Sequence, residues 1–203
     1  MLTKMQKDVL TEILNINMGS AAKVLSELTN QKVILKIPSL DLQSGNEIGF
    51  KLFDKSSDFR SSVLSTVRFG KNFSGKAYII IPFEDAKELV NACTGSYDNE
   101  KEIFSEDIDV IKEISNVILN SLIGEFGNLL NVKLSFSFPN VEFAEISAFE
   151  NSVLPLDMHF LTMCTSFLLL KSKVKGMIFI ALSTSSQNML ISKINEMLAA
   201  INE

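Results

Sequence analysis

Residues 8–15 read DVLTEILN, and residues 109–116 read DVIKEISN. The two stretches share an Asp, a Glu and an Asn at the same spacing, and Glu12 and Glu113 are 101 positions apart (113 − 12 = 101). The same separation relates four further pairs: Asp8 and Asp109, Asn15 and Asn116, Pro38 and Pro139, Gly75 and Gly176. No insertion or deletion interrupts this register. The pattern therefore predicts an internal duplication.

The two halves also show the same order of predicted elements. Helical periodicity covers 5–29 and 106–130, and a second helix closes each half at 83–93 and 185–202. The predicted strands are 33–37, 47–53, 62–69 and 76–82 in the first half, and 132–138, 141–149, 162–170 and 177–182 in the second. Each first strand is expected to end at its proline, and each last strand is expected to follow the shared glycine.

This order, α-β-β-β-β-α twice, predicts an α/β fold of the α+β type. Short polar connectors, GKNFSG and KSKVKG, are typical of hairpin turns and favour antiparallel neighbours. The runs AYIII and MIFIAL are apolar throughout, which indicates burial on both faces. We therefore expect a mostly antiparallel sheet covered by helices. Residues 1–101 and 102–203 should be related by a pseudo-twofold axis within a single domain, 1–203.

The composition excludes several classes of protein. Apolar residues make up 46% of the 203 residues and the net charge is −5, so a large core is expected and a basic nucleic-acid footprint is absent. The apolar runs are too short for a membrane span, and the N-terminus lacks a signal-peptide core, so we expect a cytoplasmic protein. The cysteines, Cys93 and Cys164, are expected to be reduced. One histidine, His159, in a loop-like stretch, leaves no ligand cluster for a metal.

Each long helix is expected to carry a polar stripe. At about 100° per residue, Asp8, Glu12 and Asn15 share one narrow face, and the apolar residues lie opposite. Asp109, Glu113 and Asn116 repeat the arrangement, with Asn120 on the same face. We therefore expect these six motif residues to face outward. Asn17 and Glu125 interrupt the apolar sides without an evident reason.

Such a stripe is usually only a solvated helix face. Its recurrence favours a function, because other exposed positions differ between the copies: Lys23 against Gly124, and Ser26 against Gly127. Asn also forms helices poorly in mid-helix. A Glu one turn from an Asn can dock a cationic partner and orient a water, and positioning of this kind supplies much of phosphoryl-transfer catalysis.

At these residues the chain resembles the CheC/CheX/FliY family, whose motif is Asp or Ser, Glu and Asn at this spacing followed by Pro. Asp8, Glu12, Asn15 and Pro38 match it, and the second half matches it with the same residue types. The resemblance covers about residues 5–200. With two motifs and no added segment, the chain is most similar to CheC-type members.

The resemblance implies a protein aspartyl-phosphate phosphatase that acts on phosphorylated CheY. Asn15 and Asn116 would orient the water, Glu12 and Glu113 would engage a lysine of CheY, and Asp8 and Asp109 would support the stripe. The chain would need no cofactor of its own, because Mg²⁺ would come with the response regulator. CheD, a receptor deamidase, is a further partner that the family implies.

A second hypothesis stays open: a non-catalytic adaptor that binds a response regulator, CheD or the flagellar switch. Substitution of both asparagines by Ala is expected to remove phosphatase activity while leaving folding intact, because exposed substitutions usually change stability by about 0.5 kcal/mol. The sequence does not decide which half is the more active, where CheD would bind, or the oligomeric state.

Overall fold

The computed structural model describes residues 2–44, 59, 61–95, 105–145, 159–169 and 173–201. In chain order its elements are α1 (Lys4–Leu28), β1 (Ile34–Ser44), β2 (Ser61–Gly70), β3 (Gly75–Pro82), α3 (Phe83–Thr94), α4 (Ser105–Leu130), β4 (Ser135–Phe136), β5 (Asn140–Glu145), β6 (His159–Leu168), β7 (Lys173–Leu182) and α6 (Thr184–Ile201). The α+β class with a mostly antiparallel sheet is confirmed.

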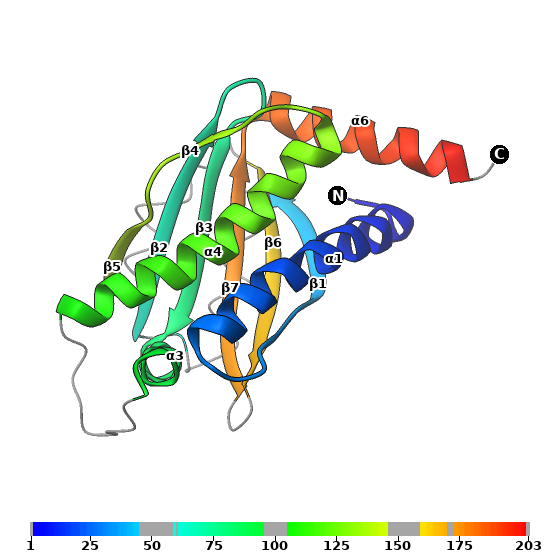
Figure 1. The fold of residues 1–203 in the computed structure, drawn as a ribbon. Coiled ribbons are helices and arrows are strands. Elements are labelled where there is room, and N and C mark those ends of the chain that lie inside the picture. The colour runs from blue at the N-terminus through cyan, green and yellow to red at the C-terminus, as the bar shows by residue number, and fades with distance from the viewer. Residues whose placement is uncertain are drawn as a thin grey trace.

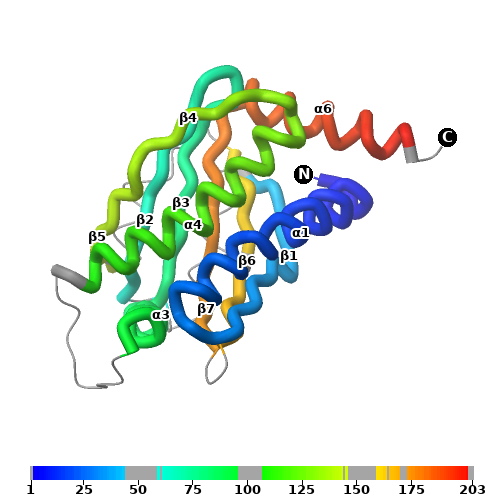
Figure 2. The backbone as a smooth tube through the Cα atoms, viewed as in Figure 1, coloured from blue at the N-terminus to red at the C-terminus, as the bar shows by residue number. Residues whose placement is uncertain are grey.

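The described strands form one seven-stranded sheet in the order β1-β6-β7-β3-β2-β4, with β5 also paired to β2. Every pairing is antiparallel. Helices α1 and α4 lie side by side across one face of this sheet (Figures 1 and 2). Helix α3 lies at one end of the strands, and α6 extends from the other end past the N-terminus.

The order of the strands has the symmetry that the duplication predicts. A shift of 101 positions relates β1 to β4 and β5, β2 to β6, and β3 to β7. The first strand of each half pairs with a strand of the other half: β1 pairs with β6, and β5 pairs with β2. Strands β3 and β7, one from each half, meet in the centre of the sheet. A pseudo-twofold axis between β3 and β7 would produce this order. Superposition of the halves stays a prediction, but the sheet is shared by both.

Local signals set the helix ends. Thr3 caps α1, and a capping box with Gln6 satisfies two backbone N–H groups. Gln6 also donates to Asn195 at 2.7 Å, which ties α1 to α6. Helix α3 has acidic residues in its first turn, which suit the helix dipole, and it ends at Gly95 with a φ of 71°.

The prolines do not act as the sequence predicts. Strand β1 continues through Pro38 to Ser44, and its pairing with β6 shifts register between Lys36 and Ser39. Because β1 is an edge strand, it tolerates a residue without an N–H group, and the shift absorbs the break in pairing. Pro139 lies between β4 and β5, so both prolines interrupt a ladder.

The predicted strands 62–69, 76–82, 162–170 and 177–182 and the closing helices are confirmed within the described residues, with shifted ends. Of the predicted strand 132–138, only the two residues of β4 form a strand. Strand β7 starts before the shared Gly176, which therefore lies inside the strand, and His159 begins β6 and does not lie in a loop. The predicted strand 47–53, and 141–149 beyond Glu145, lie outside the described residues. The apolar runs of β3 and β7 are buried at successive positions, as predicted.

Phenylalanines join helix α4 to the sheet. Phe69 of β2 stacks on Phe73 with ring centroids 5.7 Å apart, and Phe73 stacks on Phe126 of α4 at 5.8 Å. Phe73 and Phe126 are fully buried. This row of rings holds the C-terminal half of α4 on the hairpin between β2 and β3, and so fixes the helix that carries the second motif.

Candidate active site

The acidic residues of both motifs lie where the sequence predicts. Asp8 and Glu12 on α1, and Asp109 and Glu113 on α4, are all exposed. Asp109 forms an ion pair with Lys112 one turn later, with 2.8 Å between Nζ and Oδ1. An exposed pair of this kind contributes little to stability. The carboxylates are therefore available to a partner.

The two asparagines are half-buried, so the prediction that they face outward is only partly right. When about 100° is counted per residue, the buried residues of α1 centre roughly 235° around the helix from Asp8. The sequence predicts that they lie directly opposite Asp8, at about 180°. Asn15 thus lies at the margin of the buried arc, while Val24 and Leu28, which lie opposite Asp8 on the same count, are 40% and 39% exposed. The helix is rotated toward Asn15 relative to the simple prediction.

Asn15 is bound to the backbone of β1 by both ends of its amide. Its Nδ2 donates to the carbonyl oxygen of Ile37 at 2.9 Å, and the Ile37 N–H donates to Asn15 Oδ1 at 2.8 Å. Ile37 lies inside the register shift of β1, where the β6 ladder is interrupted. The side chain therefore replaces a strand partner for Ile37. This accounts structurally for a mid-helix Asn in the first half.

Asn116 has different surroundings. Its Oδ1 accepts a hydrogen bond from Asn120 Nδ2 at 2.7 Å. The counterpart of Ile37 at an offset of 101 is Phe138, which is 94% exposed where Ile37 is 1% exposed. Within the described part of the chain, Asn116 Nδ2 donates no hydrogen bond. The amide of Asn116 is thus half free, whereas that of Asn15 is fully occupied.

The structure also explains the two polar residues on the apolar sides of the helices. Asn17 donates to the carbonyl of Ile13 at 3.2 Å within its own helix, and Glu125 accepts a hydrogen bond from Asn128 at 3.2 Å. Both are only half-buried. The role of Asn120 was missed at the level of sequence, although the four-residue spacing from Asn116 is the one at which helical side chains meet.

Other chemistry has little support in the described residues. They contain no cluster of His, Cys, Asp or Glu that could hold a metal ion. Burial raises the pKa of the Cys93 thiol, which is unpaired, so it is protonated at neutral pH and a poor nucleophile. Among the described helices, none combines the length and the apolar character that a membrane span needs.

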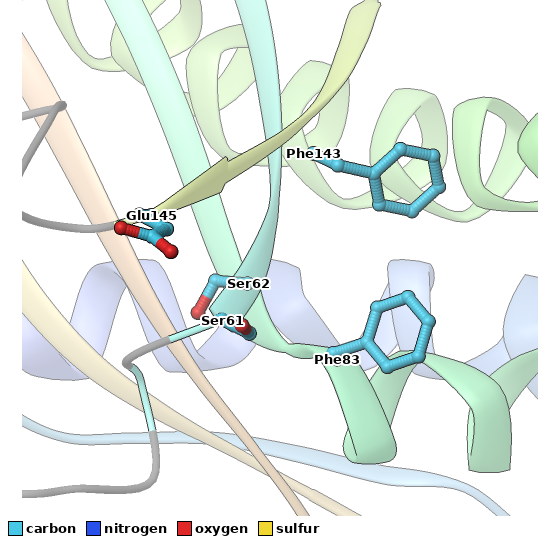
Figure 3. A pocket seen from close by; sticks show the side chains of 5 residues that line it. All are labelled: Ser61, Ser62, Phe83, Phe143 and Glu145. Atoms are coloured by element: carbon cyan, nitrogen blue, oxygen red, sulfur yellow. The ribbon is translucent and has the colours of Figure 1, made fainter.

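A cavity of about 320 Å³ lies away from the motifs, lined by Ser61, Ser62, Phe83, Phe143 and Glu145. Figure 3 shows the rings of Phe83 and Phe143 facing each other at one side of it, with centroids 6.0 Å apart, and the polar side chains at the other. None of the six motif residues lines this cavity. It offers no pair of acid and base groups for a reaction.

A family model described as CheC-like matches residues 5–40, the segment that contains Asp8, Glu12, Asn15 and Pro38. The CheY-P phosphatase CheC of Bacillus subtilis is 26% identical over 139 residues, which are 67% of this chain and 65% of that protein. In sequence, the chain is therefore similar to the CheC/CheX/FliY family.

A second curated relative shows the same similarity. The flagellar motor switch phosphatase FliY of B. subtilis is 25% identical over 149 residues, which cover 72% of this chain and 38% of FliY. The chain thus spans less than two thirds of the length of either relative.

Solved structures share the fold. The crystal structure of Thermotoga maritima FliY has a TM-score of 0.75 at 19% identity and covers 96% of this chain and 98% of that one. The FliM middle domain of H. pylori has a TM-score of 0.67 at 14% identity, and the match covers 95% of this chain and 99% of that one. At these identities the likeness shows the fold alone.

Proposed function

We propose that this protein hydrolyses the phospho-aspartate of a phosphorylated CheY-type response regulator. The observation that carries the proposal is the motif itself: in both halves an exposed glutamate stands one turn from an asparagine on the outer part of a helix. Two relatives with phosphatase names support it. The proposed partner is a cytoplasmic regulator, and we place the protein in the cytoplasm with it.

In this mechanism the protein docks on the regulator and orients the attacking water, and the regulator supplies the phospho-aspartate. Glu113 docks against a lysine of the regulator, Asp109 supports the acidic stripe, and Asn116 orients a water in line with the phosphorus. The water oxygen bonds to phosphorus as the bond from phosphorus to the aspartate oxygen breaks. The carboxylate leaves with the electron pair, and a water proton passes to the phosphate. Glu12, Asn15 and Asp8 are the corresponding groups of the first half.

The chain needs no metal of its own in this proposal. Its described residues offer no ligand cluster, so Mg²⁺ is assigned to the regulator. CheD is a further proposed partner that rests on the family resemblance.

Substoichiometric protein should accelerate phosphate release from phospho-CheY in the presence of Mg²⁺. A catalyst is reused, whereas a binding protein acts only in proportion to its amount. The measurement is inorganic phosphate released against time, with about one protein per hundred regulators, well below stoichiometry. Release that stops after one equivalent, or is not accelerated at all, would support the alternative of a non-catalytic adaptor that binds a response regulator, CheD or the flagellar switch. The occupied amide of Asn15 is the observation that favours this alternative for the first half.

Removal of the docking acids should weaken binding more than turnover. Glu12→Ala with Glu113→Ala is expected to raise KM for phospho-CheY about fivefold, because each lost rim charge costs about 1 kcal/mol or less. The change in KM should shrink at high salt, which screens exposed charges. Glu27→Ala, an exposed acid elsewhere on α1, is the matched control and should leave KM unchanged. A loss confined to kcat would contradict a docking role.

A further inference from the structure

Helix α4 carries a second amide that touches the proposed water-orienting residue. Asn120 lies one turn after Asn116, both side chains are half-buried, and Asn120 Nδ2 is 2.7 Å from Asn116 Oδ1. Asn120 Oδ1 is buried and accepts no hydrogen bond from any described residue. Turning this amide over would bury an unpaired N–H group in place of an unpaired carbonyl, and unpaired N–H groups are the rarer of the two. Asn120 is therefore the donor.

The first half has no such group. The counterpart of Asn120 is Gly19, and outside the adjacent helix backbone no described atom lies within 4 Å of the position that a Cβ would take there. There the Oδ1 of Asn15 accepts its hydrogen bond from the backbone of Ile37. Each half thus fixes the carbonyl end of its asparagine with one donor, at 2.8 Å in α1 and 2.7 Å in α4, but from unrelated parts of the chain.

We propose that Asn120 is a positioning residue of the second site, an inference that rests on the proposed function. The terminal torsion of Asn is soft, so a free Asn116 amide would rotate. A hydrogen bond to one lone pair of its Oδ1 fixes the plane of the amide. The second lone pair and both Nδ2 hydrogens then stay available, the first to accept from the attacking water and the others to donate to a phosphoryl oxygen. Asn120 itself contacts neither water nor phosphate.

Removal of the donor should lower turnover without weakening binding. Asn120→Ala is expected to reduce kcat of the second site about tenfold, because a misdirected catalytic group loses rate steeply. KM should not change, because Asn120 carries no charge and its Nδ2 is already bound to Asn116, so it does not act as a docking group. Ala forms helices better than Asn, so the helix should persist. Asn120→Gln, which keeps an amide donor on a longer side chain, should restore most of kcat.

The experiment uses the full chain with Asn15→Ala, so that only the second site works, and measures kcat and KM for phospho-CheY hydrolysis together with the thermal unfolding midpoint. Asn128→Ala is the matched control, because Asn128 makes an amide hydrogen bond of the same kind to Glu125 outside the site. A drop in kcat alone, with recovery by Gln and no effect of the control, supports the proposal. Unchanged kcat, a change in KM alone, or an unfolded Asn120→Ala protein overturns it. If Asn15→Ala with Asn116→Ala retains wild-type turnover, the proposed phosphatase mechanism itself is wrong, which is a distinct result.

Discussion

Substitution of both Asn15 and Asn116 by Ala is expected to lower phospho-CheY hydrolysis about 100-fold, because no amide is then left to orient the attacking water. The single variants should differ. Asn116 Nδ2 donates to no described residue, whereas both ends of the Asn15 amide are bound to Ile37. The Asn15 amide must therefore leave the strand before it reaches a phosphoryl group. Asn116→Ala should therefore remove most of the activity, and Asn15→Ala only a minor part.

The loss of stability should follow the opposite order: Asn15→Ala should destabilise the protein more than Asn116→Ala. This revises the expectation that the substitutions leave folding intact. Asn15→Ala leaves the N–H and carbonyl of the buried Ile37 unpaired and should cost about 1–3 kcal/mol. Asn116→Ala removes only a bond to a neighbouring side chain and should change stability by about 0.5 kcal/mol or less. Phosphate release gives the activities, and urea unfolding of each variant gives the stabilities. Wild-type turnover in the double variant would leave the adaptor hypothesis in place.

The repeated periodicity was sufficient to predict the fold class, the long helices and the exposure of the acids. These features depend on local spacing, and local spacing is visible in a sequence. The rotation of each helix about its own axis against the sheet is not determined by local spacing. The roll toward Asn15 depends on the path of β1, so the half-burial of the asparagines could not be predicted from the arithmetic of α1 alone.

The difference between the two halves has the same origin. The partner of Asn15 lies on β1, whose pairing with β6 is interrupted around Pro38. No pattern within the helix predicts a hydrogen bond to that strand. In the second half the same motif meets a chain segment that leaves Phe138 exposed. Identical helix motifs thus acquire different hydrogen bonds, because the strands that follow them pack differently.

The shared glycines provide the largest expected effect on stability. A Cβ atom at Gly75 would collide with the carbonyl oxygen of Ala181 on β7 and would lie 2.8 Å from the ring of Phe69, distances that real side chains do not adopt. At Gly176 the only close contact is the ring edge of Phe167, at 2.9 Å, and a ring can turn aside more easily than a central strand can move. Both halves retain the glycine, but the two positions should differ in how well they tolerate a larger side chain.

Gly75→Ala is therefore expected to lower the free energy of unfolding by about 3 kcal/mol, and Gly176→Ala by about 1–2 kcal/mol, the usual range for overpacking. The loss at Gly75 should reach the second site, because Phe69 leads through Phe73 to Phe126 of α4. Gly124→Ala on α4 is the control. Outside the adjacent helix backbone, no described atom lies within 4 Å of its Cβ position, so Ala should stabilise the helix by about 1 kcal/mol. Urea unfolding with a constant m-value measures all three. A Gly75→Ala protein as stable as wild type, or less affected than Gly176→Ala, would show that β3 and β7 can separate at the end of their ladder where Gly75 pairs with Leu182, and that the close approach of Gly75 to Ala181 does not hold the two halves of the sheet together.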